Sequence, residues 1–264
     1  MAIHVDNVTI SIASQRILCD SSIQFSDNKW TAIIGENGVG KSTLLQAIHQ
    51  LTPLTKGQIT VNGTIGFLFQ QADQQFFEST VEKELRFAPR HAGWSHDKID
   101  AKINDVLALV QLDRSILQML PYQLSGGQKK RLALATVLMM EPDILLADEP
   151  TAGLDPLQHD MMLDVLKTWQ QQGHTVIAIT HELADVLAFA DEVVVMKKGM
   201  APQHIDTEAF FFDAHVRQGF TFPPSVAAFH AVEQHVQRRL PRARTTAELI
   251  QIIQQEVAQR GTSD

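Results

Sequence analysis

Apolar and polar positions divide the first 70 residues into short strand-like segments. The predicted strands are Val8–Ile12, Ile23–Phe25, Trp30–Ile34, Ile59–Val61 and Thr64–Phe69. Turn residues separate them, and Asn62-Gly63 favours a two-residue β-hairpin between the last two. A helical pattern over Ser42–Gln50 follows the strand that ends at Ile34.

The period changes to that of helices over residues 71–135. Ser79-x-x-Glu82 predicts the capped start of a short helix, and Pro89 is expected to end it. The next helix has one apolar face, made of Ile99, Ile103, Val106, Leu107 and Val110. A further helix precedes Glu141-Pro142.

Strand and helix alternate again after Pro142. Asp155-Pro156 predicts a helix start, with Asp155 as the cap, and Gly173 predicts the end of that helix. Further strands are expected at Ile144–Asp148, Thr175–Thr180 and Glu192–Met196. This order indicates a parallel α/β core that a helical insert interrupts.

A last region begins after Lys198-Gly199. Thr245-x-x-Glu248 predicts a capping box, and the following helix has an apolar face at Leu249, Ile252, Ile253 and Val257. The stretch 210–224 is unusually aromatic. We favour packing of these aromatic side chains on the core, and a subunit contact is the alternative.

Composition narrows the class of protein. The 264 residues are 44% hydrophobic with a net charge of −8, which permits a real core and argues against a nucleic-acid partner. No uncharged apolar run reaches the roughly 18 residues of a membrane span, and no signal-peptide pattern opens the chain. The single cysteine, Cys19, fits a reducing compartment. His204, Asp206, Asp213 and His215 lack the spacing of metal ligands.

A glycine-rich run between a strand and a helix carries the clearest chemistry. It matches G-x-x-x-x-G-K-[ST] through Gly35, Glu36, Asn37, Gly38, Val39, Gly40, Lys41, Ser42 and Thr43. Backbone N–H groups and the helix start can surround phosphates, Lys41 can reach the β/γ-phosphates of ATP, and the Ser42 hydroxyl can bind Mg²⁺. The alternative is a turn that only joins strand to helix.

Two further runs follow along the chain. Leu124-Ser125-Gly126-Gly127-Gln128 precedes a helix, and Ile144-Leu145-Leu146-Ala147-Asp148-Glu149 is a buried-strand pattern that ends in two carboxylates. Asp148 is positioned to hold Mg²⁺, directly or through water, and Glu149 to accept a proton from an attacking water. A plain loop start is the alternative for the carboxylate pair.

The three runs, in this order, resemble those of the ATP-binding cassette (ABC) ATPases over residues 1–199. The resemblance implies an α/β P-loop NTPase (RecA-like) core with an N-terminal antiparallel β subdomain, a helical insert and a small α-rich C-terminal extension. The expected divisions are 1–70, 71–135, 136–199 and 200–264. They hold the first part of the core, the helical subdomain, the second part of the core, and an extension for dimerisation.

The resemblance also implies roles for residues outside the glycine-rich run. Gln70 matches a glutamine that senses metal and water, His181 a histidine that contacts the γ-phosphate, and Asp155 a loop at the cassette interface. Catalytic roles thus fall to Glu149, His181 and Gln70, and Mg²⁺ ligation to Ser42, Asp148 and Gln70. The signature residues Ser125, Gly126, Gly127 and Gln128 are expected to contact ATP held by a second cassette, a paralogue or another copy.

Residues 69–82 are similar to the corresponding region of energy-coupling factor (ECF) ATPases, which energise vitamin and micronutrient uptake. The implied partners are a membrane coupling subunit, contacted through Asp73, Gln74 and Gln75, and a substrate-binding membrane subunit. The chain would lie on the cytoplasmic face of the membrane. One departure is Ile12, where the family has an adenine-stacking aromatic residue. The alternatives are another ABC importer class, for amino acids or cobalt/nickel, and a soluble non-transport ABC protein, which the single acidic cassette disfavours.

Overall fold

A six-stranded sheet forms the centre of the computed structural model, which describes residues 1–13, 15–71, 76–213, 220, 222–237 and 239–261. The strand order is β5-β6-β7-β3-β8-β9. The strands are β5 (Ile65–Leu68), β6 (Ile144–Asp148), β7 (Thr175–Ile179), β3 (Trp30–Gly35), β8 (Glu192–Met196) and β9 (Gln203–Asp206). All neighbouring pairs are parallel except β8 with β9. The α/β P-loop core expected from the sequence is confirmed.

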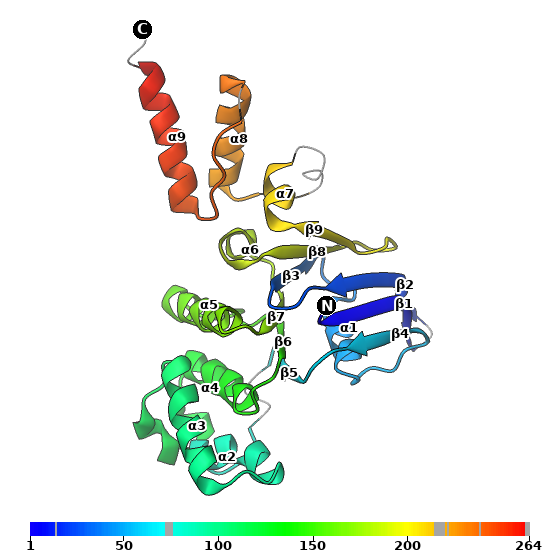
Figure 1. The fold of residues 1–264 in the computed structure, drawn as a ribbon, viewed down its shortest axis with the longest axis vertical. Helices are drawn as coiled ribbons and strands as arrows, with labels where there is room; N and C mark the ends of the chain where they lie inside the picture. The colour runs from blue at the N-terminus through cyan, green and yellow to red at the C-terminus, as the bar shows by residue number, and fades with distance from the viewer. Residues whose placement is uncertain (14, 72–75, 214–219, 221, 238, 262–264) are drawn as a thin grey trace.

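Both faces of this sheet are buried, which explains its continuous apolar strands. In β3, Ala32 and Ile34 pack on one face and Ile33 on the other. Helices α4 (Gly126–Leu138), α5 (Pro156–Gln171) and α6 (Leu183–Phe189) cover the first face (Figure 1). Helix α1 (Lys41–Ile48) and a second sheet cover the other face.

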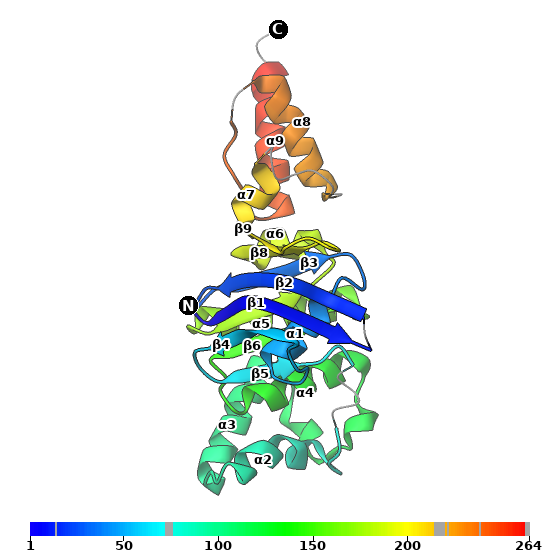
Figure 2. The same ribbon diagram turned by 90° about the vertical axis from the view of Figure 1, so that its right-hand side faces the viewer.

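The second sheet is antiparallel, as expected, with the order β2-β1-β4. It consists of β1 (Ile3–Ile12), β2 (Gln15–Phe25) and β4 (Lys56–Val61), and Figure 2 shows it lying across the front of the central sheet. The Asn62-Gly63 hairpin prediction is wrong. β4 pairs with β1, whereas β5 pairs with β6 in the other sheet, so the chain crosses between sheets at Asn62-Gly63. Asp143 fixes the crossing, because its carboxylate accepts hydrogen bonds from the Thr64 N–H and hydroxyl.

The helical insert lies at one end of the molecule (Figure 1). It contains α2 (Val81–His91), α3 (His96–Leu109), the 3₁₀ helices Arg114–Gln118 and Pro121–Gln123, and α4. The apolar face predicted for α3 is buried. Two details of α2 were predicted wrongly. Thr80, not Ser79, is its N-cap, and Pro89 lies inside it. Proline is tolerated there because the missing N–H affects only the last turn, before Gly93 bends the chain.

The C-terminal residues extend from the opposite end. β9 completes the central sheet, so the proposed division at Gly199 falls between two paired strands, and the division after Ala135 falls inside α4. Helix α7 (Thr207–Phe212) buries all three of its phenylalanines, which agrees with the favoured core-packing interpretation. Helices α8 (Pro224–Val236) and α9 (Thr246–Gly261) then project as an antiparallel pair (Figures 1 and 2). The Thr245–Glu248 capping box is present, but Val257 is exposed.

Candidate nucleotide site

The glycine-rich loop joins the end of β3 to the start of α1. Gly40 caps α1 with φ 103°, a left-handed conformation that a side chain would strain. A Cβ on Gly35 would lie 2.2 Å from the Met196 carbonyl oxygen, so β3 and β8 could not remain this close. The glycines therefore allow the loop to curl so that its backbone N–H groups and the N-terminus of α1 surround one space, as anion binding requires.

Lys41 is almost fully buried beneath this loop. Its ammonium donates to the carbonyl oxygens of Gly35 at 2.8 Å and Glu36 at 2.9 Å. Burial lowers the pKa of Lys41, while the negative charges of Glu149 and Asp148 oppose that shift. Backbone carbonyl oxygens therefore hold the Lys41 ammonium group in place beneath the loop.

Ser42 and Asp148 meet at the same place from different elements. The Ser42 hydroxyl donates to Oδ1 of Asp148 at 3.1 Å, joining the first turn of α1 to the end of β6. Asp148 is 6% exposed, and burial raises its pKa, partly offset by the Ser42 hydrogen bond. A buried carboxylate beside a hydroxyl is an oxygen donor set that fits a hard divalent cation such as Mg²⁺.

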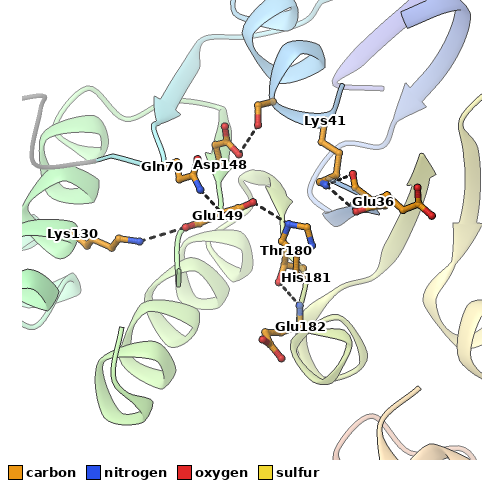
Figure 3. A network of polar contacts seen from close by, with 11 residues as sticks. Glu36, Lys41, Gln70, Lys130, Asp148, Glu149, Thr180, His181 and Glu182 are labelled. Carbon is orange, nitrogen blue, oxygen red and sulfur yellow. Dashed lines mark hydrogen bonds and ion pairs between the residues drawn. The ribbon is translucent and has the colours of Figure 1, made fainter. Parts of the chain in front are cut away.

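Glu149 lies between two side chains that the sequence places far from it (Figure 3). Its Oε2 accepts a hydrogen bond from Gln70 Nε2 at 2.7 Å, and its Oε1 lies 3.0 Å from His181 Nε2. Gln70, Glu149 and His181 follow β5, β6 and β7, three neighbouring parallel strands. Carboxyl ends of parallel strands share one edge, so this convergence follows from strand order.

Two hollows flank the glycine-rich loop. The larger, about 520 Å³, is lined by Glu36, His181, Lys198 and Phe220 among others. The smaller, about 220 Å³, includes Ile17, Gly38 and Val39, and none of its described lining residues is aromatic. Ile12 is 47% exposed at the end of β1. The described residues thus offer no aromatic ring beside the loop on that side.

The signature residues Ser125–Gln128 begin α4. Ser125 caps the helix in a capping box with Gln128. A Cβ on Gly126 would meet open space, whereas one on Gly127 would lie 2.4 Å from the side-chain oxygen of Gln158 on α5. Asp155 caps α5 by accepting a hydrogen bond from the Gln158 N–H at 3.0 Å. The helix start therefore presents Gly126 outward and rests through Gly127 on the helix that Asp155 begins.

Two residues absent from the sequence predictions, Lys130 and Gln158, contact this region, and a third, Glu84, orders the segment before α2. Lys130 on α4 reaches carbonyl oxygens next to Glu149. Gln158 packs beneath Gly127. Glu84 on α2 is buried and accepts the N–H groups of Phe77 and Glu78, and burial raises its pKa. The sequence signal for Glu84 is a charged residue on the helix face that also carries Val81 and Leu85. No local sequence pattern indicates a role for Lys130 or Gln158.

The expected membrane-subunit contacts Asp73, Gln74 and Gln75 lie outside the described residues. Two residues beyond Gln75, Phe77 is 64% exposed, and its ring meets that of Phe87 edge-on with the ring centroids 4.5 Å apart. The described residues hold no group of three or more His, Cys, Asp or Glu side chains that could bind a metal ion, and His204 pairs with Glu192. No helix among the described residues is long and apolar enough to span a bilayer.

A family model, curated relatives and solved structures all match this chain to ATP-binding subunits of ABC transporters. A family model described as "ABC transporter" matches residues 18–152. The energy-coupling factor transporter ATP-binding protein EcfA2 of Enterococcus faecalis is 36% identical over 245 residues, which cover 79% of this chain and 85% of that protein.

Two solved structures are similar over most of the chain. The structure of cbiO1 from Clostridium perfringens, part of the ABC transporter complex cbiONQ, has a TM-score of 0.74 and 28% identity, covering 89% of this chain and 96% of that one. The dimeric ATP-binding cassette MJ0796, bound to ADP and phosphate after hydrolysis, has a TM-score of 0.69 and 26% identity, covering 78% and 98%.

Proposed function

The chain belongs to the ABC transporter family of ATPases, and from that premise we propose that it is the ATP-hydrolysing subunit of an energy-coupling factor importer. The observation that carries the chemistry is Glu149, bracketed by Gln70 and His181 beside the Lys41 loop. The likeness to EcfA2 over 79% of the chain supports the importer class. The transported solute is a vitamin or micronutrient bound by a separate membrane subunit.

Hydrolysis in this site is a transfer of the γ-phosphoryl group to water. The Lys41 ammonium turns from the Gly35 and Glu36 carbonyls to the β/γ-phosphates, and the loop N–H groups bind the same oxygens. Glu149 accepts a proton as the water oxygen bonds to phosphorus and the β–γ bridging bond breaks, releasing ADP. Gln70 and His181 hold the Glu149 carboxylate, and His181 can also donate to the γ-phosphate.

Mg²⁺ is the metal that the oxygen donors fit. Ser42 and Asp148 would hold it, and the Gln70 side-chain oxygen is a third candidate at the same edge of the sheet. When bound, Mg²⁺ supplies charge neutralisation on the β- and γ-phosphate oxygens. Asp148 would hold the metal in its ionised form, which a bound cation favours, whereas burial alone raises the pKa of this carboxyl group.

A second cassette completes the site in this proposal. Gly126 opens outward at a helix N-terminus, which suits the γ-phosphate of ATP bound to a partner, identical or paralogous. The exposed ring of Phe77 follows Asp73, Gln74 and Gln75 closely in sequence and packs against that of Phe87. This aromatic pair suits a membrane coupling subunit at the cytoplasmic face. Purifying the chain from membranes and identifying the co-eluting integral subunits tests this assignment and decides between importer classes. Elution without any membrane subunit would contradict it.

Gly126→Asp is expected to reduce turnover in the assembled complex about tenfold or more, because a carboxylate would face the partner's phosphates. ATP binding by the isolated chain should not change. Gly126→Asn is the matched control, with equal volume and no charge. Steady-state hydrolysis and nucleotide titration measure both effects. Gly127→Asp is a poorer test, since its side chain would displace Gln158. Equal losses for the Asp and Asn variants would contradict the phosphate-docking role.

Ile250 and Val257 are expected to join the two cassettes without nucleotide. They are 44% and 61% exposed and lie two turns apart on one face of α9. Changing both to Glu should weaken nucleotide-free association about tenfold or more, because apolar contact is replaced by buried charge. Gln251→Glu with Gln255→Glu adds the same charge to the polar face as a control. Sedimentation measures association, and an undiminished dimer in the Ile250/Val257 variant would refute tethering through this face.

A further inference from the structure

Lys130 joins the signature helix to the segment that follows the catalytic strand. Its side chain leaves α4 one turn beyond Gly126 and points toward the backbone after β6 (Figure 3). The ammonium lies 3.5 Å from the Glu149 carbonyl oxygen, 3.4 Å from that of Pro150 and 2.5 Å from that of Ala152. One cation therefore gathers three carbonyls of a single turn.

The turn that Lys130 contacts has an unusual backbone. Glu149 has φ 48°, in the left-handed region that residues with a side chain seldom adopt. The Glu149 carbonyl also accepts the Ala152 N–H at 3.2 Å, which closes the turn. Strained conformations of this kind persist only where surrounding contacts fix them. A charged donor among the converging carbonyl dipoles supplies such a contact.

The same backbone sets where the Glu149 carboxylate points. Gln70 and His181 fix its two oxygens, but Cα and Cβ are placed by the turn. A general base must lie within hydrogen-bonding distance of the attacking water, so a small shift of this turn has a large effect on rate. These three Lys130 hydrogen bonds end on the turn after β6, which is separate in the chain from the phosphate-binding Lys41 loop.

Helix α4 also contacts the first turn of α5. Gly127 lies against the Gln158 side chain, and the Gln158 backbone N–H donates to Asp155. Lys130 and Gly127 thus tie both ends of the segment 149–158 to one helix. The N-terminus of that helix, at Ser125 and Gly126, is the part that receives the partner's ATP in the proposed function.

We propose that Lys130 is a positioning residue for ATP hydrolysis, which fixes the turn at Glu149 relative to the signature helix α4. The inference rests on the proposed function, because it assigns Lys130 a part in the same reaction. When α4 docks on the partner's ATP, its movement is transmitted through Lys130 to Glu149, the general base of the chain's own site. Lys130 acts on the chemical step and leaves ATP binding to the Lys41 loop.

Lys130→Met in the assembled complex is expected to lower kcat for ATP hydrolysis about 10- to 100-fold, with KM for ATP changed by no more than about twofold. Lys130→Arg should recover most of the rate, because its guanidinium keeps the charge and the donors. Lys129→Met removes a neighbouring charge of the same helix and should retain the unmodified rate. A rise in KM with unchanged kcat, or an unchanged rate in Lys130→Met, would overturn the inference.

A second measurement separates positioning from folding of the helix. In a Glu149→Gln background, ATP-driven association of cassettes should be as strong after Lys130→Met is added as before. Loss of association in the doubly changed chain would show that Lys130 supports the binding surface, which overturns the positioning role. An unmodified complex that lacks ATPase activity would instead contradict the proposed function itself.

Discussion

Replacing Glu149 with glutamine is expected to reduce ATP hydrolysis in the assembled complex by about 100-fold or more, the usual contribution of a general base. The amide keeps the size of the side chain and can still bond with Gln70 and His181, but it cannot accept the proton. ATP affinity should therefore remain, and ATP should accumulate in a closed pair of cassettes. Steady-state phosphate release and nucleotide-dependent sedimentation measure the two effects.

Glu182→Gln provides the matched control for this experiment. Glu182 is an exposed carboxylate one residue beyond His181, and its side chain does not cap α6. The same loss of charge there should leave hydrolysis unchanged. Turnover by Glu149→Gln close to the unmodified rate would remove Glu149 from the mechanism and leave the carboxylate with a structural role.

Lys41→Ala is expected to weaken ATP binding about 10- to 100-fold, because charge-assisted hydrogen bonds to the phosphates are lost. The effect differs in kind from that of Glu149→Gln, since it appears in the dissociation constant of the isolated chain. Removing this buried ammonium also takes away a positive charge that interacts with Asp148 and Glu149. Fluorescent-nucleotide titration of the isolated chain measures the change.

Lys56→Ala controls for the loss of a lysine elsewhere, because Lys56 is exposed at the start of β4. Its ATP affinity should match that of the unmodified chain. Thermal melting of both variants shows whether they are folded at the assay temperature. A folded Lys41→Ala chain that binds ATP as tightly as the unmodified one would contradict the role of the loop.

Local signals determined the parts of the molecule where a few neighbouring residues satisfy one another. Asp155 and Thr245 cap α5 and α9 as their spacing predicted, because each accepts a hydrogen bond from an N–H only three residues ahead. Ser125 caps α4 in the same way. The glycine-rich run likewise fixes its own shape through Gly40 and the start of α1. Recognition of the family motifs then supplied Gln70, Glu149 and His181 as a set.

Where the preference of a short residue pattern conflicted with tertiary packing, the packing determined the structure. Asn62-Gly63 has the composition of a hairpin turn, but β5 gains more by lying beside β6, where Phe67 and Leu68 are buried on opposite faces. Pro89 is a helix breaker by composition, and α2 continues through it because Pro89 is buried in the last turn.

Local residue patterns were sufficient to predict the chemistry of the glycine-rich loop, the starts of α5 and α9, and the family. The folded chain was needed to show that Lys130 reaches the turn after β6, that Gly126 and Gly127 differ in their surroundings, and that β9 belongs to the central sheet. Lys130 illustrates the reason. Its carbonyl partners lie 19 to 22 residues away and carry no side-chain pattern. Backbone oxygens look the same at every position of a sequence, and they become a site only when strand order brings a turn beneath a helix.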